Sequence, residues 1–313
     1  MNGMKRLVVV GAGAMGSFYA GKFFEMDPGC IALLAGGKRG ERLRQEGLWL
    51  NEKPYPVPVI DPGDKGPPAD LVLVAVKNHH MSQALRDMSN LIGDDTNFLS
   101  VMNGVDSEEQ IAAVYGKDRV LYAVAVGIDA VREGNRTTYT TQGKLFFGEA
   151  ENRELSPRVR ALQALFDRAG IAYETPEDMI RTLWWKFMIN VGINQLSAVL
   201  RAPYGVFQQS PPARELMETA MREVISVAKA AGVDLKEQDI EDWYSVLSSL
   251  SPKGKTSMLQ DVESGRKTEV EMFAGRVMEL GELYGVNTPL NRIVFKLIKA
   301  LEDMPGDPGH PVD

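Results

Sequence analysis

The chain has 313 residues, of which 44% are hydrophobic and 25% charged, a composition typical of a globular protein with two domains. The formal net charge of −7 argues against broad nucleic-acid binding, which needs a basic face. Cys30 is the only cysteine and there are three histidines, so we expect no disulfide, no metal site and a reduced, cytoplasmic setting. No apolar run approaches the ~20 residues of a membrane span, so we expect no membrane partner.

A buried strand, a glycine-rich turn and a helix are predicted near the start of the chain. Residues 6–10 form the strand, Gly11-x-Gly13-x-x-Gly16 the turn and residues 17–24 the helix. The first glycine allows a tight turn, the second lets backbone approach a pyrophosphate, and the third lets helix and strand pack closely. A plain glycine-rich turn is the alternative, but the order of elements favours dinucleotide binding. The cofactor-binding residues predicted here are Gly11, Ala12, Gly13, Ala14, Met15 and Gly16.

The second strand, residues 31–34, is followed by cations where an acid is usual. NAD-preferring sites end this strand with Asp or Glu, which binds the ribose 2′-hydroxyl. This chain has Lys38 and Arg39 instead, with no acid before Glu41. The two cations favour a 2′-phosphate, and hence NADP, although they also suit the start of a solvated helix over residues 39–46.

Two further strands are followed by polar residues. Residues 70–76 are predicted to form a buried strand that ends at Lys77, and residues 98–102 another that ends at Asn103-Gly104. Ligands of open α/β sheets bind outside the carboxyl ends of the strands, so we expect Lys77 and Asn103 to face the cofactor. A solvated lysine and an ordinary Asn-Gly turn are the alternatives.

The remaining pattern changes from strands to helices along the chain. We expect a strand at 120–126, a hairpin of 137–141 and 144–147 around Gln142-Gly143, a helix at 156–169 and a strand at 172–174. From residue 177 to about residue 300 the periodicity is helical. The predicted fold is an α/β Rossmann-type dinucleotide-binding domain (1–175) followed by an all-α domain (176–313). The apolar helices at 224–231 and 293–301 suit either an internal core or a homodimer interface.

Lys186, Asn190 and Asn194 are spaced four residues apart in a stretch that is otherwise apolar. On an α-helix this spacing places all three on one face. Buried polar groups need partners, so this polar ridge either pairs inside the protein or faces a polar ligand. A snorkelling lysine and satisfied core asparagines are the alternatives to a catalytic role.

The same spacing, Lys186-x3-Asn190-x3-Asn194, resembles the ketopantoate reductase (2-dehydropantoate 2-reductase) family. The run Thr256-Ser257-Met258-Leu259-Gln260-Asp261 and the later Thr268-Glu269 share this similarity. The glycine loop, Lys77, Asn103-Gly104 and the expected hairpin from Gly143 to Glu149 also match, so the resemblance spans about residues 4 to 300. The ridge and the run at 256–261 are its specific parts, since many dehydrogenases share the glycine loop.

The resemblance implies an NADPH-dependent reduction of 2-dehydropantoate, a 2-oxo acid, to (R)-pantoate on the route to pantothenate and coenzyme A. It makes Lys186 the proton donor to the ketone oxygen and assigns Asn190, Asn194 and Ser257 to the substrate. It places Lys77, Asn103 and Glu269 on the cofactor side. Without the resemblance, Ser257 is read as an ordinary helix cap and Glu269 as a solvated helix residue.

Two positions depart from the family pattern. Family members commonly have an arginine where this chain has Gly36, so Lys38 or Arg39 is expected to hold the 2′-phosphate instead. Many also have an asparagine where this chain has Tyr204, which alters the expected shape of the acyl pocket. A reductase of another 2-oxo acid and a non-catalytic NADP-sensing protein are therefore the alternatives.

Overall fold

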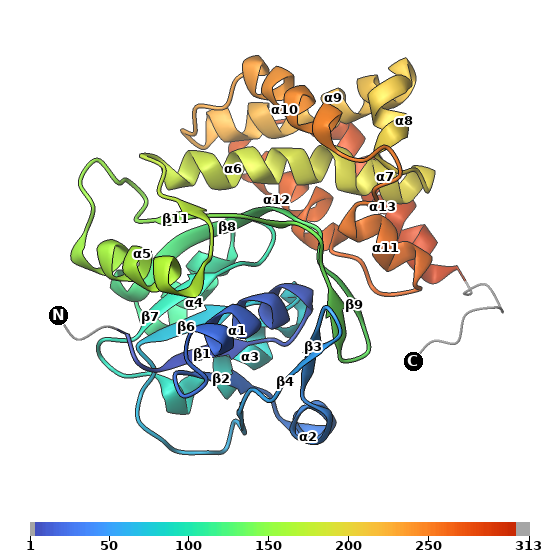
Figure 1. The fold of residues 1–313 in the computed structure, drawn as a ribbon. Helices are drawn as coiled ribbons and strands as arrows, with labels where there is room; N and C mark the ends of the chain where they lie inside the picture. The colour runs from blue at the N-terminus through green and yellow to red at the C-terminus, as the bar shows by residue number, and fades with distance from the viewer. Residues whose placement is uncertain (1–3, 305–313) are drawn as a thin grey trace. The chain divides into compact units, whose positions relative to one another are not determined.

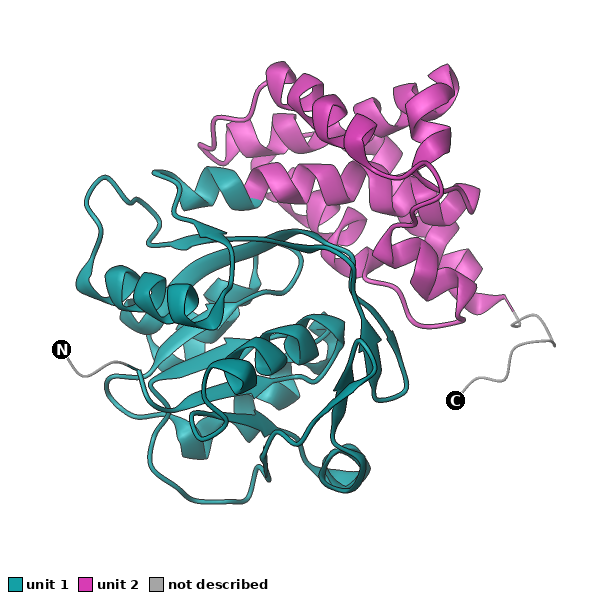
Figure 2. Cartoon of the chain, viewed as in Figure 1, with its two compact units in different colours: residues 1–183 teal, residues 184–313 magenta. Residues whose placement is uncertain are grey.

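The computed structural model describes residues 4–304. The chain divides into two compact units, residues 1–183 and residues 184–313 (Figure 2). The first contains strands and helices, and the described part of the second is helical. The division falls inside helix α6 (Met179–Ile189).

Unit 1 is built on an eight-stranded sheet with the order β12-β11-β8-β7-β6-β1-β2-β5 (Figure 1). Its neighbours pair in parallel except β8 with β11, which are antiparallel. Every residue of β1 and β6 is buried, as expected for apolar runs in the middle of a parallel sheet. The strands are β1 (Leu7–Val10), β2 (Ile31–Leu34), β5 (Val59–Ile60), β6 (Leu71–Val74), β7 (Asn97–Ser100), β8 (Val120–Ile128), β11 (Gln142–Gly148) and β12 (Tyr173–Glu174).

Four of the five α-helices of unit 1 pack in two pairs, α1 with α5 and α3 with α4, and α2 packs beside β5. Helix α5 shows how the sequence sets its ends: the Val159 N–H donates to the Ser156 hydroxyl, Pro157 is the first helical residue, and Gly170 follows the last turn in the left-handed conformation. The helices are α1 (Ala14–Met26), α2 (Gly37–Glu46), α3 (Met81–Asp87), α4 (Ser107–Tyr115) and α5 (Pro157–Ala169), with short 3₁₀ turns η1 (Asn78–His80), η2 (Ser89–Leu91) and η3 (Lys117–Arg119).

A second sheet of four strands packs against α1, and its pairing differs from the predicted hairpin. It has the order β4-β3-β10-β9, with β3 (Leu48–Leu50), β4 (Lys53–Tyr55), β9 (Val131–Glu133) and β10 (Arg136–Thr138). Strand β10 pairs with β9 and β3, whereas β11 pairs with β8, so the expected hairpin around Gln142-Gly143 is wrong. The two-residue turn is at Gly134-Asn135, and Gly143, with φ +57°, lies inside β11 against the backbone of Val126 and Gly127.

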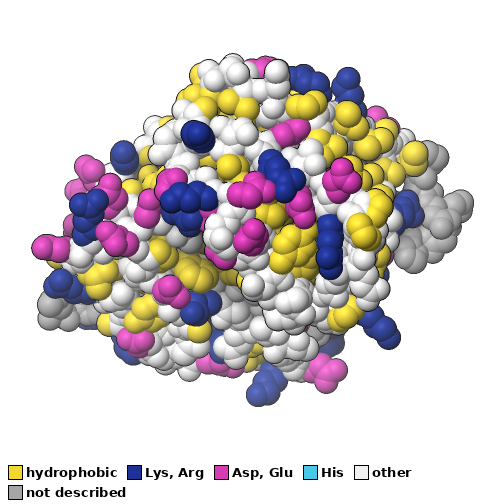
Figure 3. Space-filling model, turned by 90° about the horizontal axis from the view of Figure 1, so that it is seen from above, with side chains coloured by type: hydrophobic (Ala, Val, Ile, Leu, Met, Phe, Trp, Pro, Cys, Tyr) yellow, Lys and Arg dark blue, Asp and Glu magenta, His cyan; other side chains and the backbone are white. Residues whose placement is uncertain are grey.

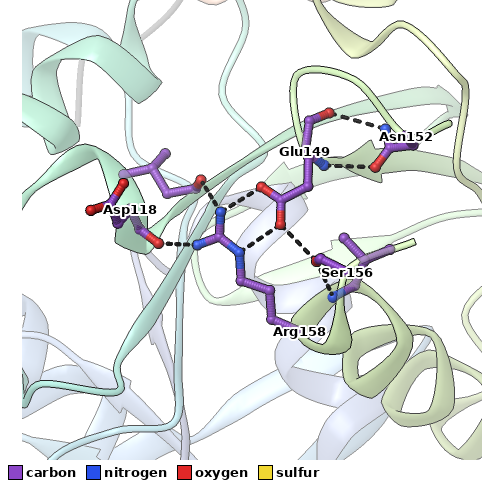
Figure 4. Close-up of polar contacts among 7 residues, drawn as sticks. Asp118, Glu149, Asn152, Ser156 and Arg158 are labelled. Atoms are coloured by element: carbon purple, nitrogen blue, oxygen red, sulfur yellow. Dashed lines mark hydrogen bonds and ion pairs between the residues drawn. The ribbon is translucent and has the colours of Figure 1, made fainter. Parts of the chain in front are cut away.

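A cluster of polar contacts holds α5 to Glu149, just after β11, and to Asp118, just before β8 (Figure 4). Arg158 Nε donates to Glu149 Oε1 at 2.7 Å and its Nη2 to Glu149 Oε2, while its Nη1 donates to the Asp118 carbonyl. The Ser156 hydroxyl donates to Glu149 as well, at 2.7 Å. Desolvation acts to raise the pKa of Glu149, but the hydrogen bonds from Arg158 and Ser156 and the charge of Arg158 outweigh it and hold that pKa below its usual range.

Arg158→Met is therefore expected to lower the free energy of unfolding by about 1–3 kcal/mol at neutral pH, because it leaves a half-buried carboxylate without its cation. Glu149 contributes this stability above its unfolded pKa of about 4.3, and the contribution is lost as the pH falls through its lower folded pKa. The difference between wild type and variant should therefore shrink in acid. Urea unfolding at neutral and acidic pH measures it.

Arg153→Met is the matched control for this prediction. The Arg153 side chain is 77% exposed and lies 3.8 Å from Glu151 and 3.6 Å from Glu177, so its loss should change stability by less than about 0.5 kcal/mol. Equal effects of the two substitutions would show that the Arg158 cluster adds nothing beyond a surface ion pair.

The described part of unit 2 consists of helices, and together with unit 1 it confirms the predicted α/β domain followed by an all-α domain. Its elements after α6 are the π-turn η4 (Asn190–Asn194), α7 (Gln195–Leu200), α8 (Tyr204–Gln209), α9 (Pro211–Ala230), α10 (Glu237–Ser249), α11 (Ser257–Glu263), the 3₁₀ turn η5 (Val270–Met272), α12 (Ala274–Tyr284) and α13 (Pro289–Asp303). Across residues 4–304, every helix is too short or too polar to cross a membrane.

The apolar segments at 224–231 and 293–301, which suited either an internal core or a homodimer interface, differ in how far their side chains are buried. Val224 and Val227 of α9 are buried in the interior of unit 2. Helix α13 buries Val294 and Ile298 but exposes Ile293 and Leu297 on its outer side. On the face that Figure 3 shows, apolar side chains are interleaved with basic and acidic ones.

Candidate active site

The glycine loop joins β1 to α1 and has the geometry that its sequence predicts. Gly11 has φ +100°, and a Cβ there would lie 2.6 Å from the Ala75 carbonyl oxygen. A Cβ on Gly16 would lie 1.8 Å from the Gly11 carbonyl oxygen. Gly13 is the N-cap residue of α1 and has no side chain that could accept from the first N–H groups of this helix. Such a helix start favours an anion.

Three cations gather at the start of α2, just beyond the carboxyl end of β2. Lys38, Arg39 and Arg42 line one open pocket. Arg39 Nη2 also donates to the Ala12 carbonyl at 2.7 Å, which ties the start of α2 to the glycine loop. Arg42 was missed in the sequence, although it follows Lys38 by four residues and therefore lies on the same helical face.

Lys77 and Asn103 lie at the same edge of the sheet as the glycine loop. β1, β6 and β7 are adjacent parallel strands, and their register pairs Val10 with Val74 and Val74 with Ser100. The loop follows β1, Lys77 comes three residues after β6, and Asn103 comes three residues after β7. Both side chains are half-buried. The structure thus brings these three predicted elements together at the carboxyl ends of the strands, where α/β sheets bind ligands.

A buried polar cluster of Ser100, Ser107 and Glu108 lies next to the loop that carries Asn103. Sequence patterns did not indicate this cluster. The Ser107 hydroxyl donates to Ser100 Oγ at 2.7 Å, and the Met102 N–H donates to the same oxygen at 3.3 Å. Glu108 is only 3% exposed, and burial raises its pKa to about 7. A Ser-Glu-Glu start is ordinary for a helix, so nothing in the sequence set Glu108 apart.

The predicted polar ridge of unit 2 is formed on a helix that changes its geometry halfway. Lys186 is in the last turn of α6, and the chain then continues through the π-turn η4 into α7. Asn190 and Asn194 are 2% and 8% exposed, and Asn194 Nδ2 lies 3.5 Å from Asn190 Oδ1. The spacing in the sequence predicts a regular α-helix here, and the structure differs. The π-turn is a finding, and such turns occur often at functional sites.

Lys186 has the electrostatic setting of a proton donor. Its side chain is partly buried, and burial lowers the pKa of its ammonium group to about 8. No charged neighbour contributes to this shift. Because desolvation disfavours the charged form, the lysine releases its proton more readily than a solvated one.

Ser257 and Glu269 occupy different settings from those of an ordinary cap and a solvated glutamate. Thr256 is the cap of α11, since its hydroxyl accepts from the Leu259 N–H at 3.2 Å, and Ser257 is the exposed residue after it. Glu269 is 8% exposed and precedes the 3₁₀ turn η5. Helix α11 packs against both η4 and α7, so the segment that begins with Ser257 adjoins the one that carries the two asparagines.

Comparison with known proteins identifies the family. The model described as Ketopantoate reductase PanE/ApbA matches residues 7–152, and the model described as Ketopantoate reductase PanE/ApbA C terminal matches residues 178–302. The chain is similar to the 2-dehydropantoate 2-reductase of Aquifex aeolicus, with 27% identity over 303 residues that cover 95% of this chain and 97% of that protein.

Solved structures share the fold along almost the whole chain. A PanE/ApbA family ketopantoate reductase from Ralstonia eutropha matches with a TM-score of 0.83 and 26% identity, covering 95% of this chain and 98% of that one. D-mandelate dehydrogenase in complex with NADH matches with a TM-score of 0.87 and 21% identity, over 95% of this chain and 99% of that one. The two family models and the Aquifex aeolicus relative confirm the resemblance drawn from the motifs: the chain belongs to the ketopantoate reductase family of oxidoreductases.

Proposed function

We propose that this protein reduces 2-dehydropantoate to (R)-pantoate with NADPH, as a step towards pantothenate and coenzyme A. The observation that carries this proposal is Lys186, whose pKa is lowered to about 8 by burial and which precedes a buried asparagine pair in a member of this family. The cofactor would supply a hydride to the carbonyl carbon. Negative charge then develops on the carbonyl oxygen, and a proton must reach that atom.

Lys186 fits the role of proton donor. Its ammonium group both stabilises negative charge on the oxygen and transfers a proton to it. A donor works best when its pKa is near the working pH, and burial brings Lys186 into that range. The lysine is left neutral and regains its proton from solvent before the next turnover.

The neighbouring polar residues are proposed to hold the substrate. Asn190 and Asn194 offer amide donors and acceptors to the hydroxyl and carbonyl groups without adding a charge that would shift the pKa of Lys186. Ser257 is assigned to the substrate carboxylate, and its exposed position after the Thr256 cap supports that assignment. Glu269 is proposed to lie near the reacting centre on the cofactor side.

The residues of unit 1 are proposed to bind NADPH. The start of α1 suits the pyrophosphate, because its first N–H groups have no side-chain cap. Lys38, Arg39 and Arg42 suit the 2′-phosphate, because all three cations line one pocket. Lys77 and Asn103, beyond the ends of β6 and β7, are proposed to face the nicotinamide half of the cofactor.

A reductase of a different 2-oxo acid is the second candidate, and Tyr204 is the observation that favours it. The Tyr204 N–H donates to the Gly254 carbonyl at 3.0 Å, and a Cβ on Gly254 would lie 3.0 Å from the tyrosine ring. The ring therefore packs on the loop that leads to Ser257. A tyrosine in place of the asparagine common in the family changes the size and the hydrogen bonding of the expected acyl pocket, and D-mandelate dehydrogenase, which shares this fold, is named for a different 2-hydroxy acid.

One assay separates these candidates. NADPH oxidation by the purified protein is followed with 2-dehydropantoate, with phenylglyoxylate and with straight and branched aliphatic 2-oxo acids. We expect the highest kcat/KM with 2-dehydropantoate. Preference for another acid would establish the second candidate, and tight NADPH binding without turnover of any acid would establish a cofactor-sensing protein instead.

A further inference from the structure

Gln195 closes the π-turn that carries the asparagine pair, and its side chain is completely buried. In a π-turn each N–H bonds one carbonyl further back than in an α-helix, which leaves a carbonyl without its usual backbone donor. Gln195 Nε2 donates to the carbonyl of Val191, which lies within this turn, at 2.8 Å. Buried amide groups are costly to leave unpaired, so this bond stabilises the widened turn.

The same carboxamide also reaches the segment that follows Glu269. The Ala274 N–H, the first of helix α12, donates to Gln195 Oε1 at 2.9 Å. Gln195 thereby caps α12, and α12 starts five residues after Glu269. One side chain is thus bonded to the turn that presents Asn190 and Asn194 and to the helix start next to Glu269.

A buried polar chain holds Gln195 itself in place. Its Nε2 lies 3.4 Å from Asn291 Oδ1, and Asn291 Nδ2 donates to Glu223 Oε2 at 2.7 Å. Glu223 also accepts from the Leu290 N–H at 2.7 Å, at the start of α13. These bonds connect the π-turn with α9, α12 and α13. A fully bonded buried network of this kind restricts its members to one arrangement.

Close packing restricts the turn from the other side. Gly192 lies in the middle of the π-turn, and a Cβ there would be 2.6 Å from two side-chain atoms of Met221 on α9. The turn therefore has little room to shift towards α9. If the π-turn relaxed to a regular α-helix, the turn would contain one residue fewer. The side chains that follow it would then point in directions rotated by about 100° about the helix axis.

We propose that Gln195 is a positioning residue of the active site: its carboxamide holds the π-turn against the start of α12 and so sets Asn190 and Asn194 relative to Glu269. This inference rests on the proposed function, because it assigns the two asparagines to the substrate. Gln195 touches neither substrate nor cofactor in this account. It acts through the geometry of the turn and therefore mainly on the 2-oxo acid, because Asn190 and Asn194 lie in that turn whereas Glu269 lies five residues before the helix start that Gln195 caps.

The test replaces Gln195 by methionine, which keeps the length of the side chain but neither donates to Val191 nor accepts from Ala274. Gln208→Met is the matched control, since Gln208 Nε2 donates to the Leu247 and Leu250 carbonyls at 2.9 Å in the same unit, outside the ridge. Gln195→Met should raise KM for the 2-oxo acid about tenfold and lower kcat, with a smaller change in KM for NADPH, as expected when a bound geometry is misplaced by a fraction of an ångström. Gln208→Met should change none of these values more than about twofold.

Equal kinetic effects of the two variants would overturn the positioning role and leave the proposed function intact. If Gln195→Met does not fold, Gln195→Glu takes its place in the same assay. Its carboxylate can still accept from the Ala274 N–H but, when ionised, cannot donate to the Val191 carbonyl. The same comparison with Gln208→Met then decides whether Gln195 is a positioning residue. If the wild type turns over no 2-oxo acid, the proposed function fails and hydrogen exchange decides the inference. Faster amide exchange over residues 186–200 in Gln195→Met, but not in Gln208→Met, then supports it, and equal exchange overturns it.

Discussion

Lys186→Ala is expected to lower kcat by roughly 10²–10⁴-fold, while the Kd for NADPH stays within about twofold of the wild-type value. The substitution removes the group that donates the proton to the ketone oxygen and stabilises the charge that develops there. NADPH binding is assigned to residues of unit 1 and to Glu269 but not to Lys186, so it should survive. Steady-state kinetics measures the first quantity, and quenching of tryptophan fluorescence on titration with NADPH measures the second.

Two further variants make this result specific to proton donation. Lys186→Arg keeps a positive charge, but the guanidinium pKa above about 12 makes it a poor acid, so kcat should stay low. Lys229→Ala removes an exposed lysine from α9 and should leave kcat unchanged. A kcat near the wild-type value in Lys186→Ala would remove Lys186 from the donor role.

Replacing Lys38 and Arg39 together by alanine should raise KM for NADPH roughly 10²-fold and KM for NADH only a few-fold. Each charge-assisted hydrogen bond to a phosphate contributes about 1.5–3 kcal/mol, and NADH has no 2′-phosphate to lose. The small effect on NADH is expected because Arg39 also donates to the Ala12 carbonyl in the glycine loop. Kinetics with both cofactors at a saturating concentration of the 2-oxo acid measures the two KM values.

A matched double variant shows whether the loss of two positive charges anywhere in unit 1 changes the KM values. Lys117→Ala with Arg160→Ala removes the same two charges from exposed positions on η3 and α5 of the same unit, and it should change both KM values equally and little. Arg42→Ala tests the third cation of the pocket and should weaken NADPH alone. If the Lys38 and Arg39 double variant weakened NADPH and NADH to the same degree, the cations would have no part in binding a 2′-phosphate.

The features predicted correctly from sequence are those that depend on a few adjacent residues. An apolar β-branched run followed by glycines fixes β1 and its turn, because only glycine tolerates the φ of +100° at Gly11 and the close backbone contact at Gly16. The four-residue spacing of Lys186, Asn190 and Asn194 likewise placed a polar ridge on an otherwise apolar helix. Local periodicity also separated the strand-containing part from the helical part.

The features that the sequence did not reveal depend on contacts between distant segments. Strand β10 pairs with β3, whose residues lie more than eighty positions earlier in the chain, so local turn signals around Gln142-Gly143 suggested the wrong hairpin. The π-turn has no distinctive residue pattern, since its stability comes from Gln195 and from α9 and α12. The buried setting of Glu269 and the capping by Thr256 instead of Ser257 likewise required the structure.

The pH dependence of kcat tests the central claim, proton donation by Lys186, most directly. The donor must carry its proton, and burial lowers its pKa to about 8, so activity is full below that pH and is lost as the pH rises through it. We predict that kcat with saturating 2-dehydropantoate and NADPH falls about tenfold per pH unit above about pH 8, and that the small residual rate of Lys186→Ala shows no such step. A kcat that stays constant to about pH 10, or the same step in Lys186→Ala, would contradict the assignment of Lys186 as the proton donor.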